Sequence, residues 1–241
     1  MDGGFQPRTL ELAGGACAWQ AWLPPGWSPG HSWPVILFLH GARERGDDGV
    51  RPTTVGLGPA LLEDPGRWPA VVVFPQARDG FGWRGPMLRR ALAALDDALL
   101  QLAGDPARQY LSGISMGAYG SWRLALENPE RFAALVPICG GLDAPPSALA
   151  RAAGDDASSD RPPAADPHAA AARILRELPT WIFHGDADGV IPVGESRTLV
   201  EAFRRAGAPV RYTEYRGVAH NSWDAAYSEK ALTDWLFAQK R

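Results

Sequence analysis

A serine flanked by two glycines near the middle of the chain offers the clearest chemistry. The segment Gly113-Ile-Ser115-Met-Gly117 has the pattern Gly-x-Ser-x-Gly, and it joins a predicted strand to a predicted helix. A serine at such a sharp turn is held in a strained conformation that exposes its hydroxyl, and the glycines avoid clashes with neighbouring segments. The N–H of Met116 then lies at a helix N-terminus, where an oxyanion is stabilised. We therefore predict Ser115 as a nucleophile; the rivals Ser112 and Ser121 fall in the strand and the helix.

An acid is predicted in the run from Pro179 to Pro192. A serine hydroxyl needs a base to take its proton, and the base needs a carboxylate to orient it. The run supplies a strand and then Asp186 and Asp188. Asp188 lies further into the loop and is the predicted acid, whereas Asp186 is expected to bond nearby backbone N–H groups. Asp143, after the preceding strand, is a second alternative.

Five histidines compete for the role of base. His220 stands between the last predicted strand and the last predicted helix, where the base of such a site must arrive, and we predict it as the base. His40 and His184 each end a strand and precede a glycine, so both lie near the same edge and are expected to brace loops. The remaining two, His31 and His168, fall in irregular segments and are expected to be solvated.

The elements that must position these side chains alternate along the chain. Short apolar, β-branched or aromatic runs predict strands at 17–23, 34–39, 70–74, 109–112, 135–139, 180–183 and 210–215. Leucines at helical spacing between Leu88 and Leu102 predict one helix, and others are predicted at 118–127, 196–206 and 223–239. Pro129 is expected to end the helix at 118–127, and Gly207 the helix at 196–206. This alternation predicts an α/β fold with a mostly parallel sheet and helices on both faces.

One stretch interrupts the alternation. Residues 143–176 are rich in Ala, Pro, Asp and Ser, which predicts an irregular insertion, either a flexible loop or a small helical insertion over the sheet edge. It is expected to be a solvated surface segment or a lid over a pocket. No internal repeat or linker divides the chain, so residues 1–241 are expected to form a single domain.

Composition excludes several classes of protein. The net charge is −3 and no basic run is present, which argues against a nucleic-acid partner. Cys17 and Cys139 allow at most one bridge and are expected to be small core residues. The longest apolar runs are about five residues, whereas a membrane span needs roughly 20. The first residues lack the features of a secretion signal, so a cytoplasmic location away from membranes is expected. The oligomeric state is not predicted.

Three segments together resemble the α/β-hydrolase superfamily. They are Gly-Ile-Ser-Met-Gly, His184-Gly-x-x-Asp188 and the tail at 211–227, and the resemblance runs from about residue 34 to residue 241. It is closest to the dienelactone-hydrolase and phospholipase-carboxylesterase-like branch, whose bacterial members are often labelled predicted peptidases or esterases. The resemblance implies an eight-stranded sheet and a catalytic triad of Ser115, Asp188 and His220.

The same resemblance implies a second oxyanion donor in the loop at 39–48. The family's His-Gly loop maps there, so the donor would be the backbone N–H of Ala42 or Arg43, with that of Met116 as the first. This sequence departs from its relatives at Arg43, where they commonly carry glycine. It also departs from the dienelactone hydrolases themselves, which carry cysteine where Ser115 stands.

These features predict a serine hydrolase that cleaves a small-molecule ester through an acyl-enzyme, without metal or cofactor. Ester bonds are favoured over peptide bonds. A small-peptide peptidase is the alternative, and a catalytically silent binding protein on the same fold is a third reading. His40, Trp83 and Trp223 are predicted to line the substrate pocket, and aromatic walls would suit small or aromatic groups on either side of the ester.

Overall fold

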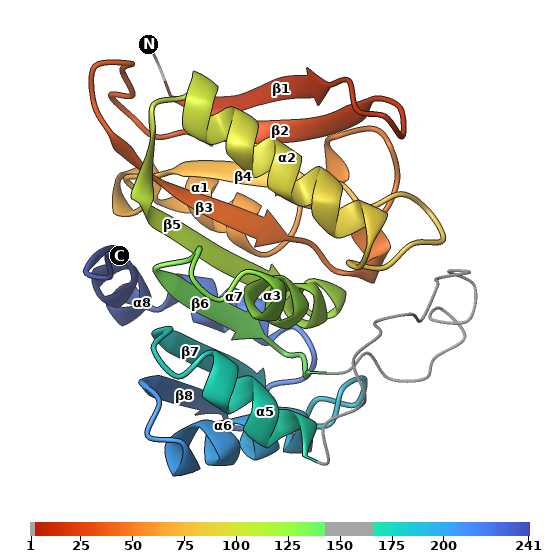
Figure 1. The fold of residues 1–241 in the computed structure, drawn as a ribbon, viewed down its shortest axis with the longest axis vertical. Coiled ribbons are helices and arrows are strands. Elements are labelled where there is room, and N and C mark those ends of the chain that lie inside the picture. Colours follow the sequence, from red (N-terminus) through yellow and green to blue (C-terminus); the bar gives the residue numbers. More distant parts are fainter. Residues whose placement is uncertain (1–2, 143–165) are drawn as a thin grey trace.

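The strands of the computed structural model, which describes residues 3–142 and 166–241, form one sheet (Figure 1). Within the described residues it has eight strands in the order β1-β2-β4-β3-β5-β6-β7-β8. Strands β4, β3, β5, β6, β7 and β8 run parallel, and β2 is antiparallel to both of its neighbours, β1 and β4. The strands are β1 (Gly4–Leu10), β2 (Cys17–Leu23), β3 (Trp33–Leu39), β4 (Val71–Pro75), β5 (Gly104–Ile114), β6 (Ala134–Ile138), β7 (Thr180–Gly185) and β8 (Val210–Tyr215). The predicted α/β fold with a mostly parallel sheet is confirmed.

Sequence patterns located seven of these strands and missed β1. The missed strand contains Pro7, and its side chains are only partly buried, so it lacks the apolar run that marked the others. Proline cannot donate a backbone hydrogen bond, so a proline within a run favours an edge strand or weakens the prediction of a strand. Strand β1 is such an edge strand, since it pairs only with β2. Strand β5 is also longer than predicted, because it begins at Gly104 rather than near Gln109.

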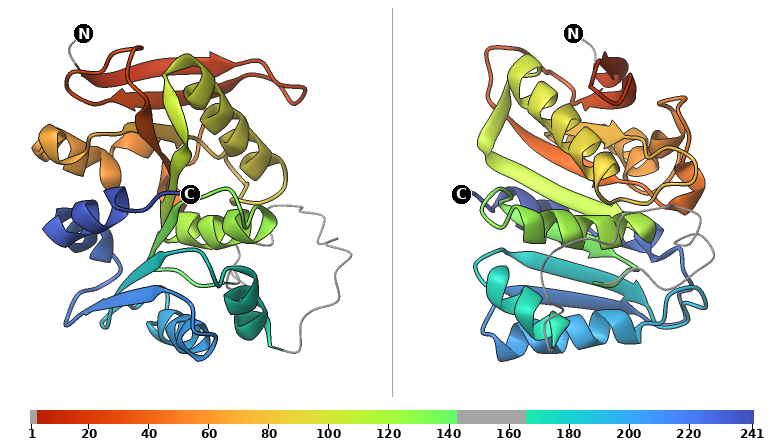
Figure 2. Two further views of the ribbon diagram at one scale, coloured as in Figure 1. Left: turned by 60° about the vertical axis from the view of Figure 1, so that its left-hand side comes forward. Right: turned by 45° about the vertical axis from the view of Figure 1, so that its right-hand side comes forward.

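Helices cover both faces of the sheet (Figures 1 and 2). One face carries α2 (Pro86–Gln101), α3 (Met116–Glu127), α5 (Pro167–Ile174) and α6 (Gly194–Arg205). The other face carries α1 (Leu57–Glu63), α7 (Ser222–Ser228) and α8 (Lys230–Phe237). In the part of the chain that the structure describes, none of these helices has both the length and the apolar character needed to cross a bilayer.

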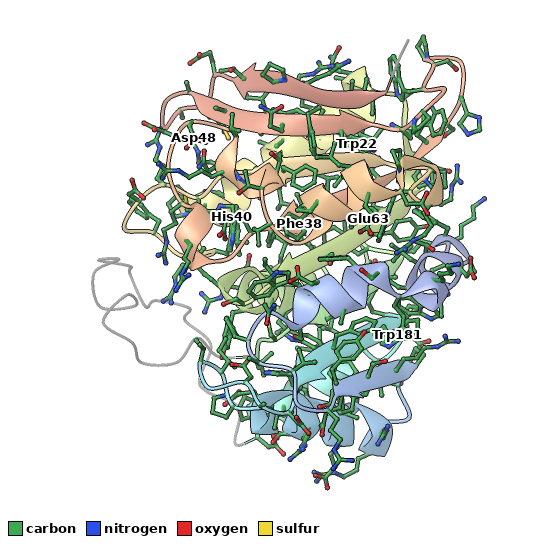
Figure 3. All side chains as sticks on the ribbon, turned by 180° about the vertical axis from the view of Figure 1, so that it is seen from behind. Trp22, Phe38, His40, Asp48, Glu63 and Trp181 are labelled. Carbon is green, nitrogen blue, oxygen red and sulfur yellow. The ribbon has the colours of Figure 1, made fainter. Side chains whose placement is uncertain are left out.

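Strand β3 shows how one apolar run supplies two cores. Successive side chains of a strand point to opposite faces. Val35, Leu37 and Leu39 therefore join the buried cluster under α2 and α3, while Ile36 and Phe38 join the cluster under α1 and α7. In Figure 3, the second face is seen from outside, with Trp22, Phe38 and Trp181 labelled among its side chains. Continuous rather than alternating hydrophobicity is the mark of a strand buried on both faces.

Two predicted helix boundaries are confirmed and one predicted helix is wrong. Helix α3 ends before Pro129, and α6 is followed by Gly207 in the left-handed conformation at φ 68°. The predicted helix at 223–239 is instead two helices, α7 and α8, because Glu229 between them is extended at ψ 112°.

The predicted irregular insertion at 143–176 ends in a regular helix. Residues 143–165, including the alternative acid Asp143, lie outside the described residues. Helix α5 follows them, with Pro167 in its first turn and the Asp166 carboxylate accepting a hydrogen bond from the N–H of Ala169 at 3.0 Å. Ala172 and Leu175 are buried in the core. This end of the segment is helical, one of the two forms expected for it, because it is capped and has an apolar face.

Candidate active site

Ser115 occupies the strained turn between β5 and α3. Its φ is 52° and its ψ −118°, a backbone conformation that residues other than glycine rarely adopt. The flanking glycines are sterically required. A Cβ on Gly113 would lie 2.3 Å from the carbonyl oxygen of Gly117, and a Cβ on Gly117 would lie 1.9 Å from that of Leu39. The spacing of the Gly-x-Ser-x-Gly motif is therefore set by the crossing of β3, β5 and α3.

This crossing gives a stability prediction. Gly117→Ala is expected to lower the free energy of unfolding by about 3 kcal/mol or more, because backbone atoms of Leu39 cannot move away without disturbing the central strand. Chemical denaturation measures the change. Gly30→Ala is the matched control, since a Cβ there meets nothing within 4 Å and should leave stability almost unchanged. Equal unfolding midpoints for the two variants would contradict this account of the motif.

The structure brings Ser115, Asp188 and His220 together. The Nε2 atom of His220 lies 2.9 Å from Ser115 Oγ, and its Nδ1 lies 2.7 Å from Asp188 Oδ2. The three residues follow the carboxyl ends of β5, β7 and β8 and meet at one edge of the sheet. Although 105 positions separate serine from histidine, their side chains are within hydrogen-bonding distance.

Asp188 is held on both of its oxygens. Oδ1 accepts hydrogen bonds from the N–H groups of Val190 at 2.8 Å and Ile191 at 2.9 Å, and Oδ2 faces His220. The side chain is fully buried. Burial by itself raises the pKa of the Asp188 carboxyl, but the hydrogen bonds from His220, Ile191 and Val190 outweigh it, so this pKa lies below its ordinary value. Asp188 is therefore ionised at neutral pH and orients the Nδ1–H of His220.

Asp186 supports the loop that carries the histidine. Its Oδ1 accepts a hydrogen bond from the N–H of Gly217 at 2.6 Å. The expected backbone bond is present, but the N–H belongs to the loop after β8 rather than to the turn of Asp186 itself. Gly185 allows that loop to approach, since a Cβ there would lie 2.1 Å from the carbonyl oxygen of Val218.

The residues predicted to line the pocket occupy different environments. His40, labelled in Figure 3, is completely buried just after β3. Both of its ring nitrogens contact backbone groups. Nε2 accepts from the N–H of Ala77 at 3.0 Å, so Nδ1 carries the proton and donates to the carbonyl of Gly41 at 2.6 Å. Burial lowers the pKa of His40 to about 4, which keeps the ring neutral. His40 thus braces the loop, and its side chain is not available to a substrate.

Trp83 is also interior. Only 4% of it is exposed, and its Nε1–H donates to the carbonyl of His40 at 2.9 Å. Its side chain fixes the loop after β4 against the loop after β3. It also packs closely on α3, where a Cβ on Gly120 would lie 2.3 Å from it. Trp223 is the predicted pocket residue that lies at the site: its ring is half-buried and meets the His220 ring edge-to-face, with centroids 5.4 Å apart.

The loop after β3 brings two charged residues to the site that sequence patterns did not single out. This loop forms a short helical turn at Ala42–Glu44 and contains the predicted donors Ala42 and Arg43. A Cβ on Gly41 would lie 2.9 Å from Glu44 Oε2 and 3.8 Å from Ser115 Cβ, so the Glu44 carboxylate reaches the neighbourhood of the nucleophile. Burial raises its pKa.

Arg45 lies beside the residue that follows the nucleophile. Its guanidinium contacts Met116 Sδ at 2.9 Å and donates to the carbonyls of Ala42 and Phe81. Neither Glu44 nor Arg45 belongs to a local pattern with known spacing. The only sequence signal for either was its place in the loop that the resemblance marked as the second half of the oxyanion site.

The rival hydroxyls are used elsewhere. Ser112 is buried within β5 and bonds the Tyr227 hydroxyl at 2.7 Å, and Ser121 bonds the carbonyl of Gly117 at 2.8 Å. Both cysteines are buried and free. Among the described residues, one group offers metal-ligand atoms, namely Cys139, Asp188 and His220, whose atoms lie within 4.8 Å of one another. Asp188 and His220 are hydrogen-bonded to each other, and a metal ion bound there would break that hydrogen bond. We therefore assign no metal to this group.

A cavity of about 520 Å³ opens beside the loop after β3. It is lined by polar, charged and apolar residues, namely Ala16, Ala18, Gly46, Asp47, Gln76, Arg78, Asp79, Phe81 and Arg90. Arg78 and Arg90 both donate to the carbonyl of Ala16 and so fasten the turn between β1 and β2. None of the three triad residues lines this cavity.

The fold and site together define the class of protein. An eight-stranded, mostly parallel sheet with a serine at the β5–α3 turn, followed in sequence by an aspartate and a histidine, is the arrangement of a serine hydrolase of the α/β-hydrolase superfamily. The sequence model of the prolyl oligopeptidase family matches residues 88–240, more than half of the chain. The protein belongs to that family, and its resemblance to the superfamily is confirmed.

Solved structures agree with this assignment. A thermostable esterase is 28% identical and superposes with a TM-score of 0.80 over 98% of this chain and 63% of its own. Two enzymes of Staphylococcus aureus share the fold: the fluorophosphonate-binding serine hydrolase F (16% identity, TM-score 0.73, 98% and 99% of the two chains) and an S-formylglutathione hydrolase (14%, 0.70, 98% and 99%). The present chain thus spans less than two thirds of the thermostable esterase. No curated protein sequence matches it.

Proposed function

We propose that this serine hydrolase cleaves carboxylic esters through an acyl-enzyme formed on Ser115. The 2.9 Å contact between Ser115 Oγ and His220 Nε2 carries the proposal, because it pairs a half-buried hydroxyl with a base that an ionised carboxylate orients. Similarity to the thermostable esterase over 98% of the chain supports the choice of esters.

In the first half of the cycle, His220 Nε2 takes the proton from Ser115 as Oγ attacks the ester carbonyl carbon. The carbonyl oxygen becomes an oxyanion. As the tetrahedral intermediate collapses, the bond to the alkoxy oxygen breaks and the imidazolium gives this oxygen its proton. The alcohol leaves and the acyl group remains on Ser115.

In the second half, water attacks the acyl-enzyme while His220 takes one of its protons. Collapse of the second intermediate breaks the bond to Oγ, the serine recovers its proton and the acid leaves. Asp188 stabilises the imidazolium in both halves. It does so as a carboxylate, because its pKa lies below its ordinary value once the hydrogen bonds from His220, Ile191 and Val190 outweigh the effect of burial.

We assign the oxyanion hole to the N–H of Met116 and the N–H of Ala42 or Arg43. Met116 is the first residue of α3, and the first N–H groups of a helix have no partner inside it. The second donor comes from the turn at Ala42–Glu44, which His40 and Arg45 hold through the carbonyls of Gly41 and Ala42. Each donor contributes on the order of 10²–10³ in rate.

Peptide hydrolysis is the second candidate, and membership of the prolyl oligopeptidase family favours it. A matched pair of substrates with the same acyl group, one a p-nitrophenyl ester and one a p-nitroanilide, separates the two. We expect the ester to be turned over far faster, with Ser115→Ala as the blank. Faster turnover of the anilide would overturn the ester proposal, and no turnover of either, together with no labelling by a fluorophosphonate, would indicate a silent binding protein.

Small or aromatic groups are the proposed substituents of the ester. Trp223 supports this choice, because its half-buried ring packs against His220 and offers an apolar wall beside the reacting atoms. Acetyl, feruloyl and longer acyl esters of one alcohol should therefore differ in kcat/KM in favour of the first two. Trp223→Ala should reduce this preference, and indifference of the wild-type protein to the acyl group would remove the idea.

A further inference from the structure

His184 is a buried histidine that the catalytic steps do not use. It lies near the end of β7, four residues before Asp188, and its side chain has no exposed surface. Its Nδ1 lies 2.7 Å from Ser196 Oγ on α6. Its Nε2 lies 3.0 Å from the carbonyl oxygen of Ile191 and 3.2 Å from Asp188 Oδ2. The ring therefore joins α6 to the carboxylate of the triad.

These partners fix the tautomer of His184. Nε2 faces two acceptors, a carbonyl and a carboxylate, so it carries the proton and donates to both. Nδ1 then accepts the hydroxyl proton of Ser196. Burial lowers the pKa of His184, so the ring is neutral at physiological pH. His184 thus presents a neutral N–H donor to Asp188.

We propose that His184 is a positioning residue that acts through Asp188, fixing Oδ2 and tempering its attraction for the His220 proton. With His184, the carboxylate accepts four hydrogen bonds, two on each oxygen. Each added donor spreads the negative charge and weakens the carboxylate as an acceptor for the others. The inference rests on the proposed triad and extends it by one residue.

The surrounding charges leave Asp188 as the dominant partner of His184. Glu214 on β8 lies opposite His184 in the sheet, but Arg197 of α6 binds both of its oxygens at 2.7 and 2.9 Å. Those hydrogen bonds lower the pKa of Glu214 to about 2. Cys139 after β6 faces Asp188 as a neutral thiol, because burial raises its pKa. Within residues 3–142 and 166–241, His220 is the remaining titratable group in contact with the carboxylate.

Two substitutions separate the donor from the packing. In His184→Gln, the amide nitrogen can reach the position of Nε2 and keep the hydrogen bond to Asp188. In His184→Asn, the shorter amide reaches only the position of Nδ1, so it can pair with Ser196 and leaves Oδ2 without its second donor. Both side chains are smaller than that of histidine, so both variants lose packing contacts in the buried site.

We expect His184→Asn to lower kcat/KM at neutral pH about tenfold per active site. We also expect it to move the acid limb of the kcat/KM profile about 0.5 to 1 pH unit higher. The limb moves up because a carboxylate with one donor fewer holds the imidazolium of His220 more tightly. His184→Gln should restore most of the rate and return the limb towards its original position. Equal behaviour of the two variants, or unmoved limbs in both, would overturn the inference and leave His184 with a packing role.

Active sites are counted by fluorophosphonate titration, which keeps a failure of this inference distinct from a failure of the proposed function. A wild-type protein that neither reacts with the fluorophosphonate nor hydrolyses esters would contradict the proposed triad itself. A reactive wild-type protein with unshifted variants removes only the role of His184. The low-field NMR signal of the His220 Nδ1–H gives a readout that needs no turnover: it should shift in His184→Asn and be largely restored in His184→Gln.

Discussion

Ser115→Ala is expected to lower kcat/KM for an ester by about 10⁴ to 10⁶, the largest loss of any single change. The variant keeps the oxyanion donors and the imidazole but has no oxygen to form the acyl-enzyme. Alanine keeps the Cβ of serine and removes only the hydroxyl, so it fits the same strained turn and the variant should fold normally. Steady-state kinetics on a p-nitrophenyl ester measure the loss.

Ser121→Ala is the matched control for this variant. Ser121 lies in the same helix, and its hydroxyl bonds the carbonyl of Gly117 rather than the base. It should therefore retain most of the activity. A Ser121→Ala protein that is as inactive as Ser115→Ala would mean that activity reports the integrity of α3 rather than a nucleophile.

Asp188→Asn is expected to lower kcat about 10⁴-fold while leaving the fold intact. The backbone N–H groups of Val190 and Ile191 will hold the amide oxygen, because they need an acceptor. The amide NH₂ then faces His220 Nδ1 and forces that nitrogen to accept. His220 would carry its proton on Nε2, pointing at Ser115, where it cannot act as a base. Burst and steady-state kinetics at several pH values measure the effect.

Asp186→Asn is the control for this substitution. Asparagine keeps an oxygen that can accept from the N–H of Gly217, so the loop after β8 should stay in place. Activity near that of the wild type is expected. If Asp186→Asn were as impaired as Asp188→Asn, the assignment of Asp188 as the partner of His220 would be contradicted.

The sequence predicted those parts of the site that depend on local geometry. Glycines at fixed spacing indicate the turn at Ser115, and the structure shows the close contacts that leave no room for a Cβ at those positions. Asp188 and His220 were predicted because parallel strands place the loops that follow them at one edge. Strands such as β2 and β8 were predicted with correct bounds because their apolar or β-branched runs end at turn residues.

Apart from the meeting of Ser115, Asp188 and His220, features that depend on contacts between distant segments were not predicted. Strand β1 is defined by its pairing with β2, and its own residues carry only a weak pattern. Trp83 was expected in the pocket because it follows a strand, yet its hydrogen bond to the carbonyl of His40 draws it inside. The link from His184 to Ser196 joins a strand to a separate helix, and no local pattern encodes it.

The most direct test of the nucleophile is the mass of the protein after treatment with a fluorophosphonate, followed by mapping of the modified peptide. One adduct per chain, on the peptide that contains Ser115, is predicted, and it should be lost in Ser115→Ala. An adduct on another residue, or an unmodified protein that still hydrolyses esters, would contradict the assignment of Ser115 as the group that carries the acyl intermediate.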